Sequence, residues 1–247
     1  MKNKLSVVLI TKNEESNIER CLKSARFADE IIILDSRSID RTVNICQNFQ
    51  CRVYQTEWFG FGLTKKKAVS FAKNNWILSL DADEQITSEL REEIDKILQN
   101  PEFKAYSIKR ISYYLGKKIK YCGWNRDFPV RLFDKNYANF NDKIVHESVV
   151  VQGDKGRINQ PILHYTYPTI ESHLKKMEHY STLGSQTLLE KNRRSTPLSA
   201  FMRGFLKFLK MYFLQLGFLD GIHGFVLCLN SSWGIYLKYL KLWKLNK

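Results

Sequence analysis

The sequence has few residues that could cross-link the chain. Its 247 residues include five cysteines, and no two of them form a C-x-x-C pair. The cysteines are Cys21, Cys46, Cys51, Cys122 and Cys228. An odd set at these spacings indicates neither a disulfide framework nor a zinc site of familiar pattern, so we expect a reducing, cytoplasmic location.

Long apolar runs are also missing. The apolar stretch at residues 5–10 is too short for the core of a signal peptide and runs directly into charged residues. The longest charge-free stretch of the C-terminal region, residues 221–237, contains one histidine, one asparagine and two serines. A membrane span needs about 20 predominantly apolar residues, so we expect no span here.

Acidic residues are outnumbered, with 25 Asp and Glu against 39 Lys and Arg and a formal net charge of +14. Such a balance favours nucleic acid, an anionic membrane or a phosphorylated ligand as partner. Charge alone does not choose among the three.

Short apolar segments alternate with helical patterns over the first hundred residues. Strands are expected at residues 5–10, 30–34, 52–55 and 76–80. This rhythm predicts an α/β fold with parallel strands joined by right-handed crossovers. In such sheets, ligands bind beyond the carboxyl ends of the strands. The polar residues at these ends are Asn13, Glu14, Asp35, Asp81 and Asp83.

Asp81 and Asp83 follow a strongly apolar segment with only Ala82 between them. Two carboxylates facing one cavity repel each other, and a Mg²⁺ ion shared with substrate phosphates removes that cost. The alternative is the start of a helix, with Glu84 or Thr87 as its cap. The pattern by itself leaves both interpretations open.

Three blocks carry a resemblance to a known family. The segments LSVVLITKNEE (5–15), DEIIILDSRSIDRT (29–42) and WILSLDADE (76–84) together resemble the family-2 inverting glycosyltransferases of GT-A fold. The resemblance implies a Rossmann-like mixed sheet flanked by helices, a UDP-sugar donor, and Mg²⁺ or Mn²⁺ as cofactor.

The same resemblance implies roles at the nucleotide. Thr11, Asn13 and Glu14 would line the nucleoside pocket, and Asp35 would accept a hydrogen bond from uracil. Helix capping by Asn13 or Glu14, and a solvated turn for Asp35, are the structural alternatives.

For the diphosphate, the resemblance points to Lys65 as the pairing cation. Asp81 would contact the ribose or a metal-bound water, and Asp83 would bind the cation directly. His164 either approaches the metal or the diphosphate, or is a core histidine.

Residues 123–127, 130–133 and 145–147 resemble one branch of the family, the bacterial lipopolysaccharide core glucosyltransferases that modify a heptose. An inverting transfer needs a single base on the acceptor side. Glu147 is the first candidate for that base and Asp127 the second.

Acceptor contacts are expected from Trp124, Arg131 and His146, with ordinary packing as the alternative for each. The sequence departs from the family at Arg37 and Ile39, where the family usually has Gly and Thr. A β-carbon at position 37 restricts the loop if its φ must be positive.

We expect a catalytic domain at residues 1–170, divided into a nucleotide-sugar half (1–100) and an acceptor half (101–170). Residues 171–247 should form a helical, basic and aromatic extension. Arg203, Lys207 and Lys210 fall on one helical stripe among aromatics, the layout of a helix that lies in a membrane interface. An ordinary helical subdomain, packed on the first domain or pairing two chains as a homodimer, is the alternative.

These observations predict a cytoplasmic enzyme, peripheral on the inner face of the membrane, that moves a hexose from a UDP-sugar to a lipid-linked saccharide. The acceptor could instead be another lipid-linked molecule or a protein. A basic nucleic-acid-binding module is the rival from another class. A P-loop is disfavoured because no G-x-x-x-x-G-K-[ST] motif is present, and for the predicted enzyme we expect no nucleic-acid partner.

Overall fold

The computed structural model describes residues 2–142 and 147–247, which divide into two compact units. The sheet unit comprises Met1–Arg110 and Asp127–His164, and the helical unit comprises Ile111–Arg126 and Tyr165–Lys247. Strands β6 (Ala105–Tyr114) and β11 (Gly156–Tyr167) contribute residues to both units. The domain boundary expected at residue 170 stays a prediction.

Parallel strands form the first half of the sheet, in the order β3-β2-β1-β4. They are β1 (Leu5–Thr11), β2 (Glu30–Asp35), β3 (Arg52–Gln55) and β4 (Trp76–Asp81). Antiparallel pairing continues the order as β8-β6-β11-β5. The remaining strands are β5 (Glu84–Ile86), β7 (Lys117–Lys118), β8 (Val130–Asp134), β9 (Ala138–Phe140) and β10 (Val149–Val151). The predicted mixed sheet is therefore confirmed.

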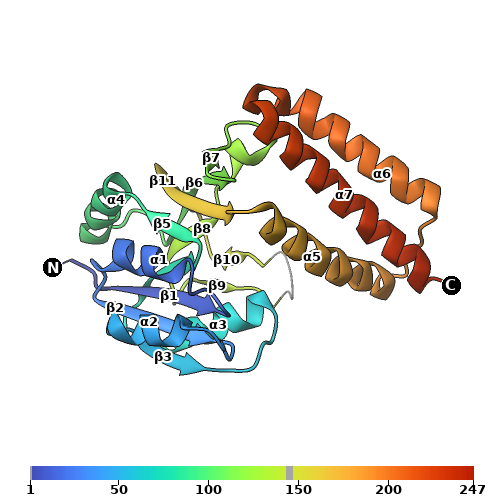
Figure 1. Cartoon of the computed structure of the whole chain (residues 1–247). Helices are drawn as coiled ribbons and strands as arrows, with labels where there is room; N and C mark the ends of the chain where they lie inside the picture. Colours follow the sequence, from blue (N-terminus) through green and yellow to red (C-terminus); the bar gives the residue numbers. More distant parts are fainter. Residues whose placement is uncertain (1, 143–146) are drawn as a thin grey trace. The chain divides into compact units, whose positions relative to one another are not determined.

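Helices cover both faces of the parallel strands (Figure 1). They are α1 (Ile18–Ala25), α2 (Thr42–Asn48), α3 (Phe61–Ser70) and α4 (Ser88–Gln99). Val7 and Leu9 of β1 share one core cluster with α1 and α4, whereas Val8 shares a second cluster with α3. This alternation follows from the period of two along a strand. It explains why β1 is apolar at consecutive positions.

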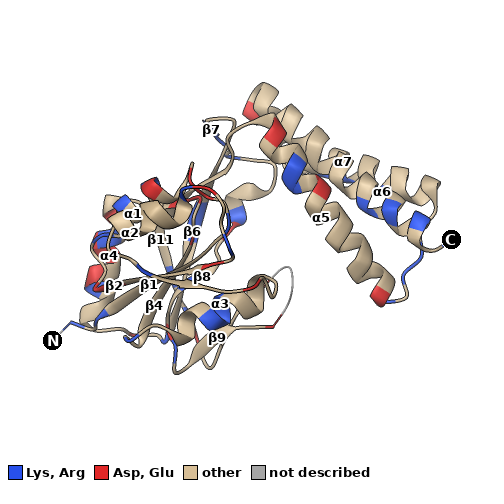
Figure 2. Cartoon of the chain, turned by 60° about the horizontal axis from the view of Figure 1, so that its bottom comes forward, with Lys and Arg blue, Asp and Glu red and all other residues tan. Residues whose placement is uncertain are grey.

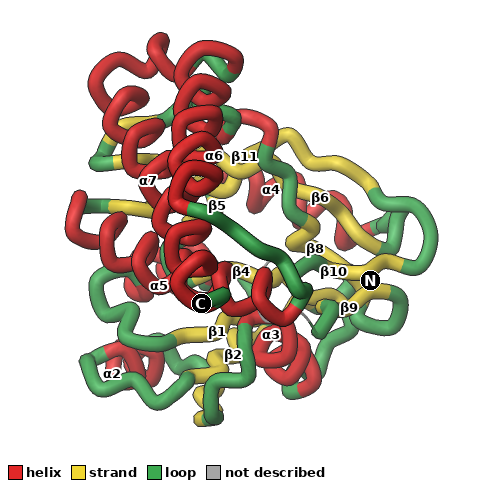
Figure 3. The backbone as a smooth tube through the Cα atoms, turned by 90° about the vertical axis from the view of Figure 1, so that its right-hand side faces the viewer, coloured by secondary structure: helices red, strands yellow, loops and turns green. Residues whose placement is uncertain are grey.

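The helical unit is built around α5 (Ile170–Glu190), α6 (Pro197–Leu209) and α7 (Gly221–Leu245) (Figure 3). Thr169 and Thr196 begin α5 and α6 with capping boxes. A π-helical turn (Lys210–Leu214) and a 3-10 turn (Gly217–Asp220) connect α6 to α7. A β-carbon on Gly204 of α6 would lie 3.1 Å from the Ser232 carbonyl oxygen of α7, so glycine permits this close helix contact.

Within the described residues, no single helix combines the length and apolarity that a membrane crossing requires. One bent pair, Pro197–Leu214 with Gly217–Leu245, satisfies both criteria when its two helices are taken together, with a bend of 71°.

Candidate active site

Three strand ends lie at the same level of the sheet. Thr11 of β1 is in register with Asp35 of β2, and Ile10 is in register with Asp81 of β4. The polar residues that follow these strands therefore meet at the carboxyl edge, where the sequence pattern placed a ligand site.

Asp35 is fully buried and accepts several hydrogen bonds. The Thr11 hydroxyl donates to its Oδ2 at 2.8 Å, and the Ser38 N–H donates to its Oδ1 at 2.8 Å. The Ser38 hydroxyl donates to Oδ2 as well. Asp35 is thus no solvated turn residue, because it joins β1 to the loop after β2.

The loops after β1 and β2 are held together by further hydrogen bonds. The Asn13 N–H donates to Ser38 Oγ at 2.8 Å, and Asn13 Oδ1 accepts from the Ile39 N–H at 2.9 Å. The Glu14 N–H donates to Thr42 Oγ1 at 2.8 Å. The side-chain oxygen of Asn13 therefore accepts a hydrogen bond from the facing loop and does not cap α1, whose N-cap position is residue 17.

Arg37 adopts a φ of 59°, in the left-handed region that favours glycine. This is the position where the family usually has Gly, so the loop keeps the glycine-like conformation despite the side chain. The Arg37 guanidinium forms an ion pair with Glu57.

Asp81 lies among three cations. Lys65 Nζ is 2.7 Å from its Oδ1, Arg131 pairs with its Oδ2, and Arg110 Nη1 is 4.0 Å away. Burial opposes ionisation of this carboxyl, but the charges of Arg131, Lys65 and Arg110 hold its pKa well below the ordinary value. Asp81 is therefore a carboxylate.

Glu84 is fully buried and completes this network. Its Oε1 accepts from Arg131 Nη2 at 2.6 Å and from Arg110 Nη1 at 3.2 Å, while its Oε2 accepts from the Asp81 N–H. Of the two caps that the sequence offered for a following helix, Thr87 is confirmed, because its hydroxyl accepts from the Leu90 N–H at the start of α4. Glu84 as a cap is wrong, because it lies in β5.

Glu147 reaches the same cluster through Lys65. Lys65 Nζ donates to Glu147 Oε1 at 2.7 Å while it also contacts Asp81. The Lys65 side chain is only 4% exposed, whereas that of Glu147 is 19% exposed. One buried ammonium thus joins the predicted base to Asp81, the last residue of β4. The predicted contact His146 lies outside the described residues.

Asp127 flanks the other side of the cluster. Its Oδ2 accepts from Arg110 Nε at 2.7 Å, and Arg110 links it to Glu84. Both candidates for the base therefore border the network, each held by a different cation. Arg110 was not singled out from the sequence, because no local motif marks a strand residue that pairs across the sheet, and Glu84 was named only as a possible helix cap.

Asp83 faces a histidine. His164 Nε2 of β11 lies 3.4 Å from Asp83 Oδ1, and both side chains are largely buried. This contact places His164 beside the carboxylate that is predicted to bind the metal, and both interpretations of His164 stay predictions. Within the described ranges no group of three or more His, Cys, Asp or Glu side chains is arranged to hold a metal ion.

The donor set nevertheless fits a hard divalent ion that shares its coordination with a substrate. A carboxylate and an imidazole supply two ligands, and Mg²⁺ commonly takes one or two carboxylates together with phosphate oxygens and water. The network of ion pairs around Asp81 joins three cations to four carboxylates.

The two other predicted acceptor contacts are placed differently. Arg131 is buried and points its guanidinium at Asp81 and Glu84. Trp124 belongs to the helical unit, where it packs edge-on against Tyr114 and close to Tyr167. Acceptor binding by either residue stays a prediction.

The sequence profile of the glycosyl transferase family 2 matches residues 6–152. The chain is 31% identical to an uncharacterized glycosyltransferase of Rickettsia typhi, over 98% of this chain and 88% of that protein. It is also 25% identical to the lipopolysaccharide core biosynthesis glycosyltransferase LpsC of Rhizobium meliloti, over 97% of this chain and 92% of that protein.

Among solved structures, residues 1–349 of S. aureus TarS superpose with a TM-score of 0.52 at 14% identity, covering 98% of this chain and 90% of that one. The same protein in complex with UDP-GlcNAc gives a TM-score of 0.53 at 13% identity over the same shares. At these identities the likeness shows the fold alone.

Proposed function

Because the chain belongs to glycosyl transferase family 2, we propose that it transfers a hexose, with inversion, from a UDP-sugar to a sugar of the lipopolysaccharide or lipooligosaccharide core. The observation that carries the catalytic part is the bridge from Glu147 through Lys65 to Asp81. It ties a partly exposed carboxylate to the edge where the loops after β1, β2 and β4 converge.

The donor side uses the polar residues of that edge. Thr11 and Asp35 form a buried pair beside Asn13 and Glu14, in the place where the resemblance puts the nucleoside. A crystal structure of TarS, which has a similar fold, contains UDP-GlcNAc. We propose a UDP-sugar donor for this chain by analogy with that complex. Glucose is the hexose implied by the resemblance.

Asp83 and His164 would hold a Mg²⁺ or Mn²⁺ ion. When bound, the ion supplies positive charge that stabilises the departing diphosphate. Lys65 lies close enough to Asp81 to add a second positive charge at this edge. Arg131 and Arg110 keep Asp81 ionised, and both hold the Glu84 carboxylate in place through hydrogen bonds.

On the acceptor side, Glu147 would accept the proton of the attacking hydroxyl. A bond then forms between that oxygen and the anomeric carbon, the bond from this carbon to the phosphate oxygen breaks, and UDP leaves. One base suffices, in contrast to the two carboxylates that flank the bond in a glycosidase. Asp127, held by Arg110, is the second candidate for this role.

The lipopolysaccharide core is the proposed acceptor because LpsC, a core biosynthesis enzyme, aligns over almost the whole chain. Heptose is the acceptor sugar that the resemblance implies. Another lipid-linked saccharide or a protein is the alternative acceptor.

We further propose that the chain is cytoplasmic and attaches to the inner face of the membrane through α6. Its exposed large apolar residues recur at helical spacing on one stripe. They are Leu198, Phe201, Met202, Phe205 and Leu206. Neither α6 nor α7 contains an acidic residue, and Figure 2 shows their Lys and Arg in blue. A homodimer that covers this stripe is the competing explanation.

The test is a panel of nucleotide sugars with Mg²⁺ or Mn²⁺, following UDP release and then transfer to a heptose-bearing core saccharide. Asp83→Asn should abolish transfer, because the residue that is to hold the ion loses its charge. Asp142→Asn removes an exposed carboxylate paired with Lys66 and serves as the matched control. An active Asp83→Asn enzyme, or no UDP release from any nucleotide sugar, would contradict the proposal.

A further inference from the structure

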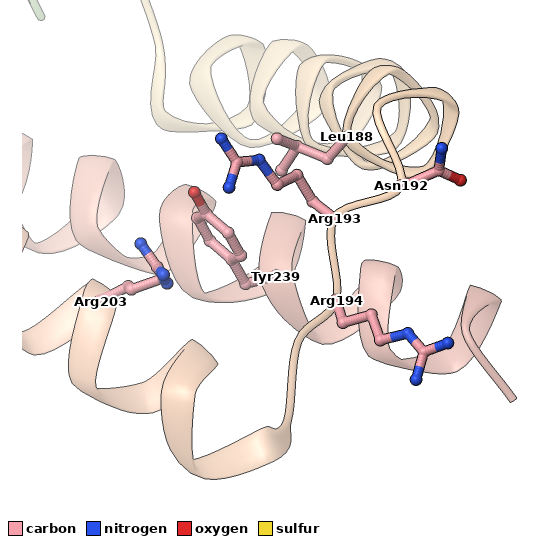
Figure 4. Close-up of a pocket in the computed structure, with 6 residues that line it drawn as sticks. All are labelled: Leu188, Asn192, Arg193, Arg194, Arg203 and Tyr239. Carbon is pink, nitrogen blue, oxygen red and sulfur yellow. The ribbon is translucent and has the colours of Figure 1, made fainter.

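The helical unit contains a cavity of about 550 Å³ beside the turn that joins α5 to α6 (Figure 4). It is lined by Leu188, Asn192, Arg193, Arg194, Arg203 and Tyr239. Its volume lies within the range of about 300–1,000 Å³ that is typical of small-molecule sites. None of these residues belongs to the site proposed for sugar transfer.

The backbone of this turn is held in place. Asn192 has a φ of 53° and ends α5, so that the Arg193 N–H donates to the Leu188 carbonyl at 2.9 Å. From the end of α7, Asn246 accepts from the Ser195 N–H at 3.2 Å and donates to the Arg193 carbonyl at 3.4 Å. The position of Arg193 is therefore set before any ligand arrives, which reduces the entropy lost on binding.

The cavity is positively charged without internal compensation. Within residues 2–142 and 147–247, no carboxylate forms an ion pair with Arg193, Arg194 or Arg203, whereas Lys241 of the same unit pairs with Glu178 at 2.7 Å. The Arg203 guanidinium lies 4.4 Å from the centre of the Tyr239 ring. Burial and, after it, the charge of Arg203 lower the pKa of the neighbouring Lys238.

The side chains are arranged around the tyrosine. Figure 4 shows the Tyr239 hydroxyl pointing toward the Arg193 side chain, with Arg203 on the other side of the ring and Arg194 turned outward. Arginine presents a planar fork of donors that matches phosphate oxygens, and the tyrosine hydroxyl adds one more donor. An apolar wall is supplied by Leu188.

We propose that this cavity binds a phosphate monoester carried on a larger molecule. A phosphate dianion can accept from both guanidinium groups and the hydroxyl at once, and the volume leaves room for the group that carries it. The phosphate could belong to a membrane lipid headgroup or to a phosphorylated sugar. Phosphate binding in this cavity does not require sugar transfer. The cavity proposal can therefore fail while the proposed function holds, and the proposed function can fail while the cavity proposal holds.

The test compares two double variants of the full chain. Arg193→Gln/Arg203→Gln removes two charges from the cavity. Lys118→Gln/Lys175→Gln removes two exposed charges from the same unit outside the cavity and is the matched control. The soluble probe is glucose 1-phosphate, measured by calorimetry against glucose. The lipid probe is a phosphatidylcholine vesicle with phosphatidic acid, measured by flotation against a vesicle with phosphatidylglycerol at equal charge.

We expect the cavity variant to weaken binding of the phosphomonoester probe about ten-fold or more, while the control stays within about two-fold of the wild type. Loss in the vesicle arm alone identifies a lipid headgroup as the source, and loss in the soluble arm identifies a sugar phosphate. Equal losses in the two variants, or no preference of the wild type for a phosphomonoester in either arm, would overturn the proposal.

Discussion

In the sheet unit the cations of the site are paired, whereas in the helical unit a group of arginines has no carboxylate partner among the described residues. Lys65, Arg131 and Arg110 each contact at least two carboxylates. Arg193 and Arg203 instead line a cavity. Paired charges preorganise a site, because each partner fixes the other, while unpaired charges gain most when an anion arrives from outside. The paired network of the first unit is therefore suited to chemistry, and the unpaired arginines of the second unit are suited to binding an anion.

The largest expected effect tests whether the paired network serves chemistry. Glu147→Gln removes the proposed base while keeping the shape of the side chain, and should lower kcat about a hundred- to ten-thousand-fold. Binding of the UDP-sugar, followed by calorimetry, should change little. Asp127→Asn is the matched variant on the other side of the network. If Asp127→Asn loses activity and Glu147→Gln does not, the roles of the two residues are reversed.

Two adjacent lysines of α3 test the cost of breaking the network. Lys65→Met leaves Asp81 and Glu147 without their shared cation and should lower the free energy of unfolding by about 3–5 kcal/mol. Lys66 is exposed and pairs with the exposed Asp142, so Lys66→Met should cost less than about 1 kcal/mol. Urea unfolding of both variants measures the difference, and equal losses would show that the buried bridge adds no stability.

A smaller effect concerns the apolar stripe of the helical unit. Phe205→Ser/Leu206→Ser should reduce binding to anionic vesicles about ten- to a hundred-fold, because less apolar area enters the lipid interface. Val150→Ser changes an exposed apolar residue of the sheet unit and should have no effect. Sedimentation of the wild type without lipid distinguishes the alternative, since a dimer that the double variant dissociates would point to a protein interface.

A further expected effect is a pH dependence of stability in the helical unit. Burial lowers the pKa of His173 to about 4, and its Nδ1 lies 3.0 Å from the Tyr114 hydroxyl. The unfolded chain binds this proton more readily, with an ordinary pKa of about 6.5. Stability is therefore complete above about pH 6.5 and declines as the pH falls toward 4.

His173→Gln should flatten that decline, since the amide does not titrate. His179→Gln, in the same helix, is the control and should retain it. Thermal unfolding between pH 4 and pH 7 measures both, and an unchanged slope in His173→Gln would assign the acid sensitivity to other groups.

The strand ends were predictable from the sequence because the evidence for them is local. A short apolar run such as residues 5–10 favours a buried strand, and parallel strands bring their carboxyl ends to one edge. That reasoning places Asp35 and Asp81 together, as the register confirms. It could not show that Asp35 is buried and accepts from Thr11, because burial depends on how the next loop folds back.

The partners of Asp81 were not predictable. Arg131 comes from β8 and Arg110 from β6. Both are antiparallel strands, and no local sequence pattern predicts their register. The sequence also offered Glu84 as a helix cap, but tertiary contacts recruit it into strand pairing with β11. Local propensity does not predict this role of Glu84, because a buried carboxylate is stable only next to cations, and these come from other segments of the chain.

By itself, the sequence determined the α/β alternation, the family and the acidic edge, since these depend on periodicity and on motifs of neighbouring residues. Only the tertiary structure decided that one lysine joins Asp81 to Glu147, that Asp83 faces His164, and that a cavity rich in arginine forms beside the α5–α6 turn. Each of these joins residues far apart along the chain, and their charges interact only after folding has removed the water between them.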